Sequence, residues 1–73
     1  EIFLKMALAM NPDGIDPNYF YGDFLFRDKR YVEARVVLER ALAAADRPGR
    51  EVADAGRRAE VKALLIKVQS ELN

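Results

Sequence analysis

Apolar residues recur along this chain at intervals of three and four positions, and polar stretches interrupt the pattern in three places. This spacing puts apolar side chains on one side of an α-helix. The stretches at residues 11–14 and 46–49 each contain Pro and Gly, which end helices and favour turns. The pattern therefore predicts an all-α protein with four helices, short polar turns and no strand.

The first predicted helix covers residues 1–10, which are rich in the good helix formers Ala, Leu and Met. No N-cap residue precedes this helix, and Pro12 followed by Asp13 and Gly14 ends it. Because the chain opens with Glu1 inside an apolar helical pattern, we expect it to be part of a longer protein.

The second predicted helix runs from Asp16 to about Asp28. Asp16 is a favourable N-cap, and Pro17 suits the first helical position because its missing N–H needs no partner there. The helix is unusually aromatic, and such a run taken alone also fits a strand. Its length, its Asp-Pro start and its helical neighbours favour helix. Its large apolar residues are Tyr19, Phe20, Tyr21, Phe24, Leu25 and Phe26.

The third predicted helix spans about residues 31–45 and the fourth about residues 51–72. Each carries one apolar stripe at helical spacing. Gly56 lies inside the fourth helix, where it costs about 1 kcal/mol relative to Ala. A Gly kept at that cost leads us to expect another helix packed closely against it.

The chain repeats itself with an offset of 34 residues. Leu4-x-x-Ala7-Leu8 recurs as Leu38-x-x-Ala41-Leu42, and Gly22 and Gly56 are separated by the same 34 positions. A period of this length is typical of helix-pair repeat proteins. Two features that share one offset are difficult to assign to chance.

The repeat resembles the tetratricopeptide family, whose motif begins with a bulky residue, a small one and a bulky one, here Tyr21, Gly22 and Leu25. The motif continues with small, large and small residues, which are Ala34, Leu38 and Ala41, and Tyr31 also fits. Two antiparallel helices approach closely only where small side chains meet, which gives the spacing a physical cause. Leu4, Ala7 and Pro12 match the closing half of an upstream repeat.

The resemblance covers nearly the whole chain as one domain of a bacterial-type tetratricopeptide protein. It implies half a repeat in residues 1–14, a complete repeat in residues 15–48, and a C-terminal capping helix in residues 49–73. Three departures stand out. Asn18 takes a place where the family often has a large residue, Asp46 replaces the closing Pro, and Lys29-Arg30 replaces the usual Gly turn.

Composition narrows the possible functions. The 73 residues include 12 Lys and Arg against 12 Asp and Glu, so the basic excess of a nucleic-acid binder is missing. Without Cys or His, most nucleophile–base pairs and the usual zinc sites are excluded, and no nucleotide-binding motif occurs. Residues 11–14 resemble a calcium loop, but its frame would place Ala9 and Phe20 at ligand positions. We therefore expect no enzyme activity, cofactor or metal.

Neither an apolar run of membrane length nor a signal peptide is visible, so we expect no membrane insertion. The sequence does not decide the cellular location, which is the cytoplasm or, if an export signal lies upstream, the periplasm. The absence of Cys does not decide between them.

The family resemblance implies a protein-interaction module that holds a protein or peptide segment in a concave groove. Tyr19, Asp23, Phe26 and Arg27 fall where the family's first helix faces that groove. Because Tyr19, Asp23 and Phe26 follow one another at four and three residues, they share one helical face suited to an apolar segment carrying a positive charge. Core and inter-repeat packing is the expected role of Tyr21, Phe24 and Leu25.

A purely structural role is the alternative, in which the helices pack on an upstream domain or on another copy of the chain. Binding predicts exposed Tyr19 and Phe26 side chains, whereas the structural role predicts buried ones. The first helix also presents an apolar face, formed by Phe3, Met6 and Met10, through which we expect self-association.

Overall fold

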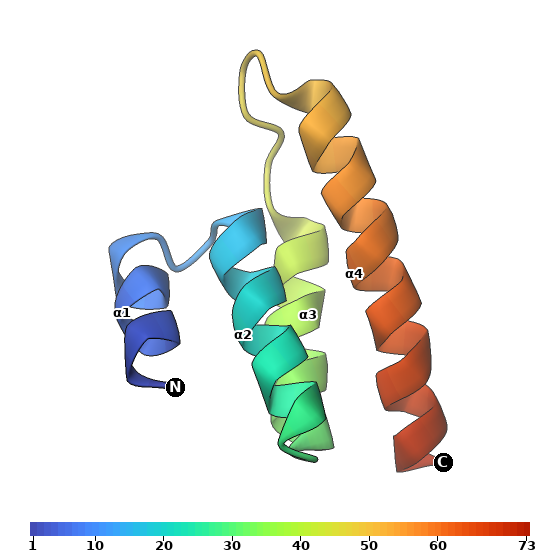
Figure 1. Ribbon diagram of the computed structural model, residues 1–73. Helices are drawn as coiled ribbons and strands as arrows, with labels where there is room; N and C mark the ends of the chain where they lie inside the picture. Colours follow the sequence, from blue (N-terminus) through green and yellow to red (C-terminus); the bar gives the residue numbers. More distant parts are fainter.

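A computed structural model describes all 73 residues as four α-helices that pack antiparallel (Figure 1). The helices are α1 (Ile2–Met10), α2 (Ile15–Arg27), α3 (Tyr31–Ala43) and α4 (Glu51–Leu72). The predicted all-α class is confirmed. None of the helices is long and apolar enough to cross a membrane.

The core lies among α2, α3 and α4. Helix α2 packs against both α3 and α4, and α3 packs against α4, whereas α1 contacts α2 alone. Helix α1 accordingly contributes no buried residue. The core residues are Ile15, Tyr21, Leu25, Ala34, Val37, Leu38, Ala41, Ala44, Val61, Leu64 and Val68. Tyr21 and Leu25 are buried as predicted, and Phe24 is half-buried against the same cluster.

Helices α2 and α3 approach closely at Gly22. A Cβ atom added there would lie 2.5 Å from Leu38 Cδ2 and 2.6 Å from Leu38 Cγ. Leu38 is fully buried, and so are Ala34 and Ala41 on the same helix. The absence of a side chain at Gly22 therefore leaves room for Leu38 of the partner helix.

Gly56 has no helix packed closely against it, so the prediction for this residue is wrong. No heavy atom lies within 4 Å of the position that its Cβ would occupy, and the residue is exposed on α4. The chain has no helix on that side of α4. The 34-residue offset thus relates Gly22, which α3 covers, to Gly56, which no helix covers.

The start of α2 also differs from the prediction. Helix α2 begins at Ile15 with Gly14 as its N-cap in an extended conformation, and no side chain caps it. Ile15 is almost completely buried in the core, which favours an earlier helical start. The Asp16 carboxylate instead pairs with Arg47 and Arg57 from the other end of the chain.

Asn18 fixes the turn between α1 and α2. Its fully buried side chain donates from Nδ2 to the Pro12 carbonyl at 2.9 Å and to the Gly14 carbonyl at 2.8 Å. These two carbonyls belong to the turn that positions α1. A polar side chain here therefore substitutes hydrogen bonds for apolar packing.

A tight cap joins α2 to α3 without glycine. Lys29 takes the left-handed conformation, with φ of 62°, a position that Gly usually occupies at helix ends. The Lys29 N–H donates to the Phe26 carbonyl at 3.0 Å and the Arg30 N–H to the Leu25 carbonyl at 2.8 Å. These two bonds form a Schellman motif, which satisfies the last carbonyls of α2.

Candidate functional site

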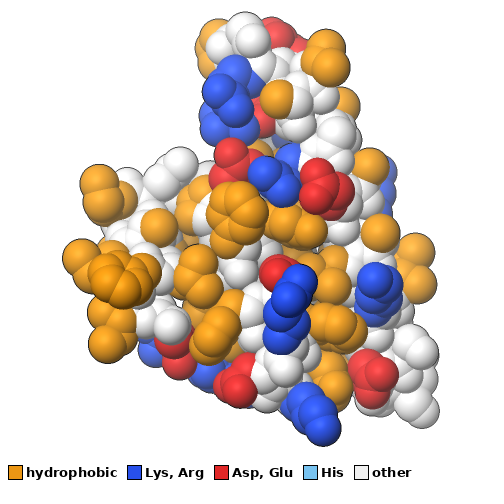
Figure 2. Space-filling view, in the orientation of Figure 1, with side chains coloured by type: hydrophobic (Ala, Val, Ile, Leu, Met, Phe, Trp, Pro, Cys, Tyr) orange, Lys and Arg blue, Asp and Glu red, His pale blue; other side chains and the backbone are white.

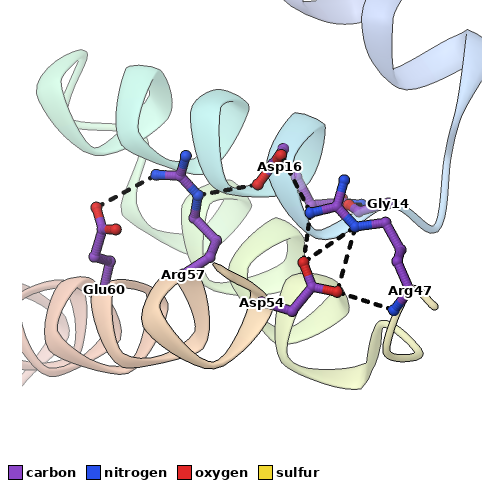
Figure 3. Close-up of polar contacts among 7 residues, drawn as sticks. Gly14, Asp16, Arg47, Asp54, Arg57 and Glu60 are labelled. Atoms are coloured by element: carbon purple, nitrogen blue, oxygen red, sulfur yellow. Dashed lines mark hydrogen bonds and ion pairs between the residues drawn. The ribbon is translucent and has the colours of Figure 1, made fainter. Parts of the chain in front are cut away.

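Of the four residues on α2 that the family resemblance implies, Tyr19 lies against α4. The centre of the candidate surface is Arg57 of α4, whose guanidinium carbon lies 4.8 Å from the ring centroids of both Tyr19 and Phe20. Arg57 is held on both sides, because Nε donates to Asp16 at 3.0 Å and Nη1 to Glu60 at 3.3 Å (Figure 3). The guanidinium thus lies against two aromatic rings with its direction fixed.

A second arginine fixes the position of α4 relative to α2. Arg47, in the segment between α3 and α4, makes a forked ion pair with Asp54, whose carboxylate also accepts the Arg47 backbone N–H at 2.9 Å (Figure 3). Arg47 Nη2 lies 3.5 Å from Asp16 Oδ2. The side-chain hydrogen bonds of Arg47 and then its backbone N–H hold the pKa of the fully buried Asp54 at about 2.

The predicted site residues are brought together only in part. Tyr19 and Phe26 are both half-buried and pack against the core. They are therefore neither fully exposed, as a binding role predicts, nor fully buried, as a structural role predicts. The Phe26 ring lies 5.7 Å from that of Tyr31 on α3. Asp23 and Arg27 form an ion pair at 3.0 Å on the surface of α2, and Arg27 is largely exposed.

The environment of Tyr19 confirms that it is partly withdrawn from water. Burial raises the pKa of its phenol, and the negative charges of Glu60 and Asp23 raise it further. The hydroxyl therefore remains a neutral group at physiological pH. The Tyr19 hydroxyl can therefore donate or accept a hydrogen bond at a contact with another molecule.

Phe20 is the residue that the sequence reasoning did not single out. Nearly half of it is exposed (45%), and it borders an open hollow of about 360 Å³ between α1 and α2. The hollow is lined by Ala7, Met10, Asn11, Asp16, Pro17 and Phe20. A helical projection of α2 places Phe20 away from the buried stripe of Tyr21 and Leu25. This position could have predicted from the sequence that Phe20 is exposed.

The charges of this surface are directed mainly at one another. The carboxylates of Asp16, Asp23 and Glu60 each pair with an arginine, so the surface has less free negative charge than the sequence implies. No group of three or more acidic side chains lies close enough together to hold a metal ion. What remains accessible is an aromatic and apolar surface suited to contact with another molecule.

A separate polar cluster attaches the start of α1 to α2. The Tyr21 hydroxyl donates to the Glu1 carboxylate at 2.6 Å, and Arg30 pairs with the same carboxylate at 2.8 Å. Arg30 also pairs with Glu33 at 2.8 Å. The Tyr21 hydroxyl is the main cause that lowers the pKa of Glu1, with Arg30 adding to it. The cluster orients α1 without covering its outer face.

Comparison with known proteins adds no relative, since no family model, no curated protein and no solved structure matches the chain.

Proposed function

We propose that this chain is a tetratricopeptide-like module that binds an apolar segment of a protein or peptide along the outward side of α2. Support for the repeat comes from the 34-residue offset together with the order of helix contacts. Helices α2 and α3 are joined at Gly22 and Leu38, and α4 packs on both of them. Each helix of such a repeat packs on its neighbours along the stack.

The observation that carries the binding proposal is the position of Phe20. It is an exposed aromatic side chain at the edge of a hollow, and Arg57 holds its ring from one side. Rigid aromatic residues next to a concavity commonly provide most of the binding free energy of an interface. Tyr19, Asp23, Phe26 and Arg27 extend this surface along α2, as the family resemblance implies.

The ligand that suits this surface is mainly apolar. Asp23, which favoured a positively charged segment in the sequence reasoning, is already engaged by Arg27 at 3.0 Å. Glu60 is likewise engaged by Arg57. The preference for a positive charge is therefore weaker than the preference for apolar side chains that fill the hollow.

A purely structural role is favoured by a different observation. Tyr19 and Phe26 pack against the core, as they would if they only joined α2 to its neighbours. Replacing them by Ala would damage the core together with any binding surface. The test must therefore use Phe20, whose side chain can be shortened with less damage to the fold.

The experiment is a selection from a random peptide display library, followed by titration of a selected peptide into labelled protein. We expect shifts at amides of α2 and at the hollow, and an affinity about 30-fold lower for Phe20→Ala, because truncating an aromatic anchor commonly costs about 2 kcal/mol. Val32→Ala is the matched control, since Val32 is exposed on α3.

Two results would overturn the binding proposal. The first is that repeated selections give no peptide that binds the folded protein. The second is that a selected peptide binds elsewhere, so that Phe20→Ala and Val32→Ala weaken binding equally and the shifts lie on α3. Either result would leave the structural role as the better account.

A further inference from the structure

Helix α1 has an uncovered apolar face. Phe3 and Met10 are 85% and 87% exposed, and Ile2 and Met6 are largely exposed as well. These side chains form the apolar cluster over α1 at the left of the molecule (Figure 2). A contiguous cluster of this kind is unusual on a monomer surface and marks a place of contact.

The 34-residue offset relates two residues of this face to covered positions, and relates Ile2 and Met6 to the exposed Val36 and Arg40. Phe3 corresponds to Val37 of α3, and Met10 corresponds to Ala44. Val37 and Ala44 are only 6% and 8% exposed, because α3 has α2 on one side and α4 on the other. Helix α1 has α2 alone, so it lacks the neighbour that α2 provides for α3.

Helix α4 shows the reciprocal gap. The offset relates exposed residues of α4 to buried residues of α2, among them Gly22, which packs on Leu38 of α3. Apart from Ile15, whose equivalent Gly49 precedes α4, the buried residues of α2 are Asn18, Tyr21, Gly22 and Leu25, and their equivalents on α4 are the exposed Val52, Ala55, Gly56 and Ala59. Helix α4 therefore lacks the neighbour that α3 provides for α2.

The two uncovered faces differ from their covered equivalents in a compensating way. On α4, the large Tyr21 and Leu25 are replaced by Ala55 and Ala59. On α1, the smaller Val37 and Ala44 are replaced by Phe3 and Met10. The α1 face therefore has larger side chains than its covered equivalent, and the α4 face has smaller ones. Close packing between two helices depends on the combined side-chain volume of both faces, so the two changes offset each other.

We infer that α1 of one molecule packs on α4 of a second copy of this chain, with the helices in the register of the α2–α3 pair. The contact continues the existing interface, because Gly56 of the second copy corresponds to Gly22 and Leu4 of the first molecule corresponds to Leu38. Large side chains on α1 then meet small ones on α4. The contact joins two different faces, α1 of one molecule and α4 of the next, so it is heterologous (head-to-tail). Each dimer keeps one free face of each kind and can add further copies.

The experiment uses sedimentation of the whole chain from about 10 μM to about 1 mM, the range in which small interfaces associate. Phe3→Glu blocks the α1 face and Ala59→Glu blocks the α4 face, both at exposed residues. Val32→Glu, an exposed apolar residue of α3 outside both faces, is the matched control. Circular dichroism confirms that each variant keeps its helices.

We expect the wild type and Val32→Glu to grow with concentration beyond a dimer, while each blocked variant alone stays at the 8.3 kDa monomer. An equimolar mixture of the two blocked variants should form a dimer and nothing larger, because one native face remains on each. If Ala59→Glu alone still dimerises, α1 pairs with α1 and the head-to-tail contact is wrong. A wild type that stays monomeric throughout would show that something other than a second copy covers these faces.

Discussion

A methyl group added at Gly22 would lie 2.5 Å and 2.6 Å from two carbons of Leu38, about 1 Å closer than carbon atoms normally approach. Leu38 has no exposed surface, and its neighbours Leu25 and Ala34 are equally buried, so the side chain cannot move aside cheaply. Overpacking of this kind costs about 1–3 kcal/mol. Gly22→Leu adds three further carbons, so we expect its cost to reach or exceed the upper end of that range.

Gly56 provides an internal control for Gly22. Both glycines lie inside helices, so replacement by Ala brings each about 1 kcal/mol of helix propensity. At Gly56 nothing opposes this gain, and the free energy of unfolding should rise by about 1 kcal/mol. At Gly22 the clash offsets or exceeds it. The difference between the two substitutions, about 1–3 kcal/mol, isolates the cost of the close contact.

Urea unfolding followed by circular dichroism at low protein concentration measures these differences. Gly22→Ala should lower the midpoint and Gly56→Ala should raise it. In a Leu38→Ala background the clash is removed, so Gly22→Ala should become neutral or stabilising there. Equal increases of the midpoint for Gly22→Ala and Gly56→Ala, or an unchanged midpoint for Gly22→Leu, would refute the close-contact reasoning.

Two further predictions concern buried polar groups. The folded pKa of Asp54 is lowered from 3.8 to about 2, so the stabilisation from its pairing with Arg47 is present above about pH 4 and is lost as the pH falls towards 2. Glu1 and Glu33 have lowered pKa values too, so urea midpoints across this range should fall for the wild type and fall less steeply for Asp54→Asn. Asn18→Ala removes the side-chain donor of the Pro12 carbonyl and leaves the Gly14 carbonyl with the backbone N–H of residue 18 alone, so we expect a loss of about 1 kcal/mol and faster amide exchange in α1. Unchanged exchange in α1 would contradict this role of Asn18.

The helices could be predicted from the sequence because each depends on local signals. Apolar spacing and the polar turns, two of which contain Pro and Gly, located α1 to α4, and the resemblance to the tetratricopeptide motif marked Gly22 as a close-contact position. The start of α2 was misplaced because burial of Ile15 outweighed the capping preference of Asp16. The assignment of Gly56 was wrong because a sequence repeat does not say whether the partner helix is present.

The candidate surface was less predictable, since it depends on pairs far apart in the chain. Asp16 is 41 residues from Arg57 in the sequence, and no local sequence pattern predicts the contact between them. That contact places the guanidinium over Tyr19 and Phe20. The helical face of Tyr19 and Phe26 was predictable from their spacing, but their packing against the core depends on how α3 and α4 dock.

The order of helix contacts has a consequence for how quickly the chain folds. Apart from α2 with α4, each contact joins helices that are consecutive in the sequence, and only residues 28–30 separate α2 from α3. Little loop-closure entropy is lost before these contacts form, and helical proteins of this kind fold in microseconds to milliseconds. The α2–α3 hairpin is the natural nucleus, so Leu38→Ala should slow folding. Truncations on α1 should leave the folding rate almost unchanged and accelerate unfolding instead.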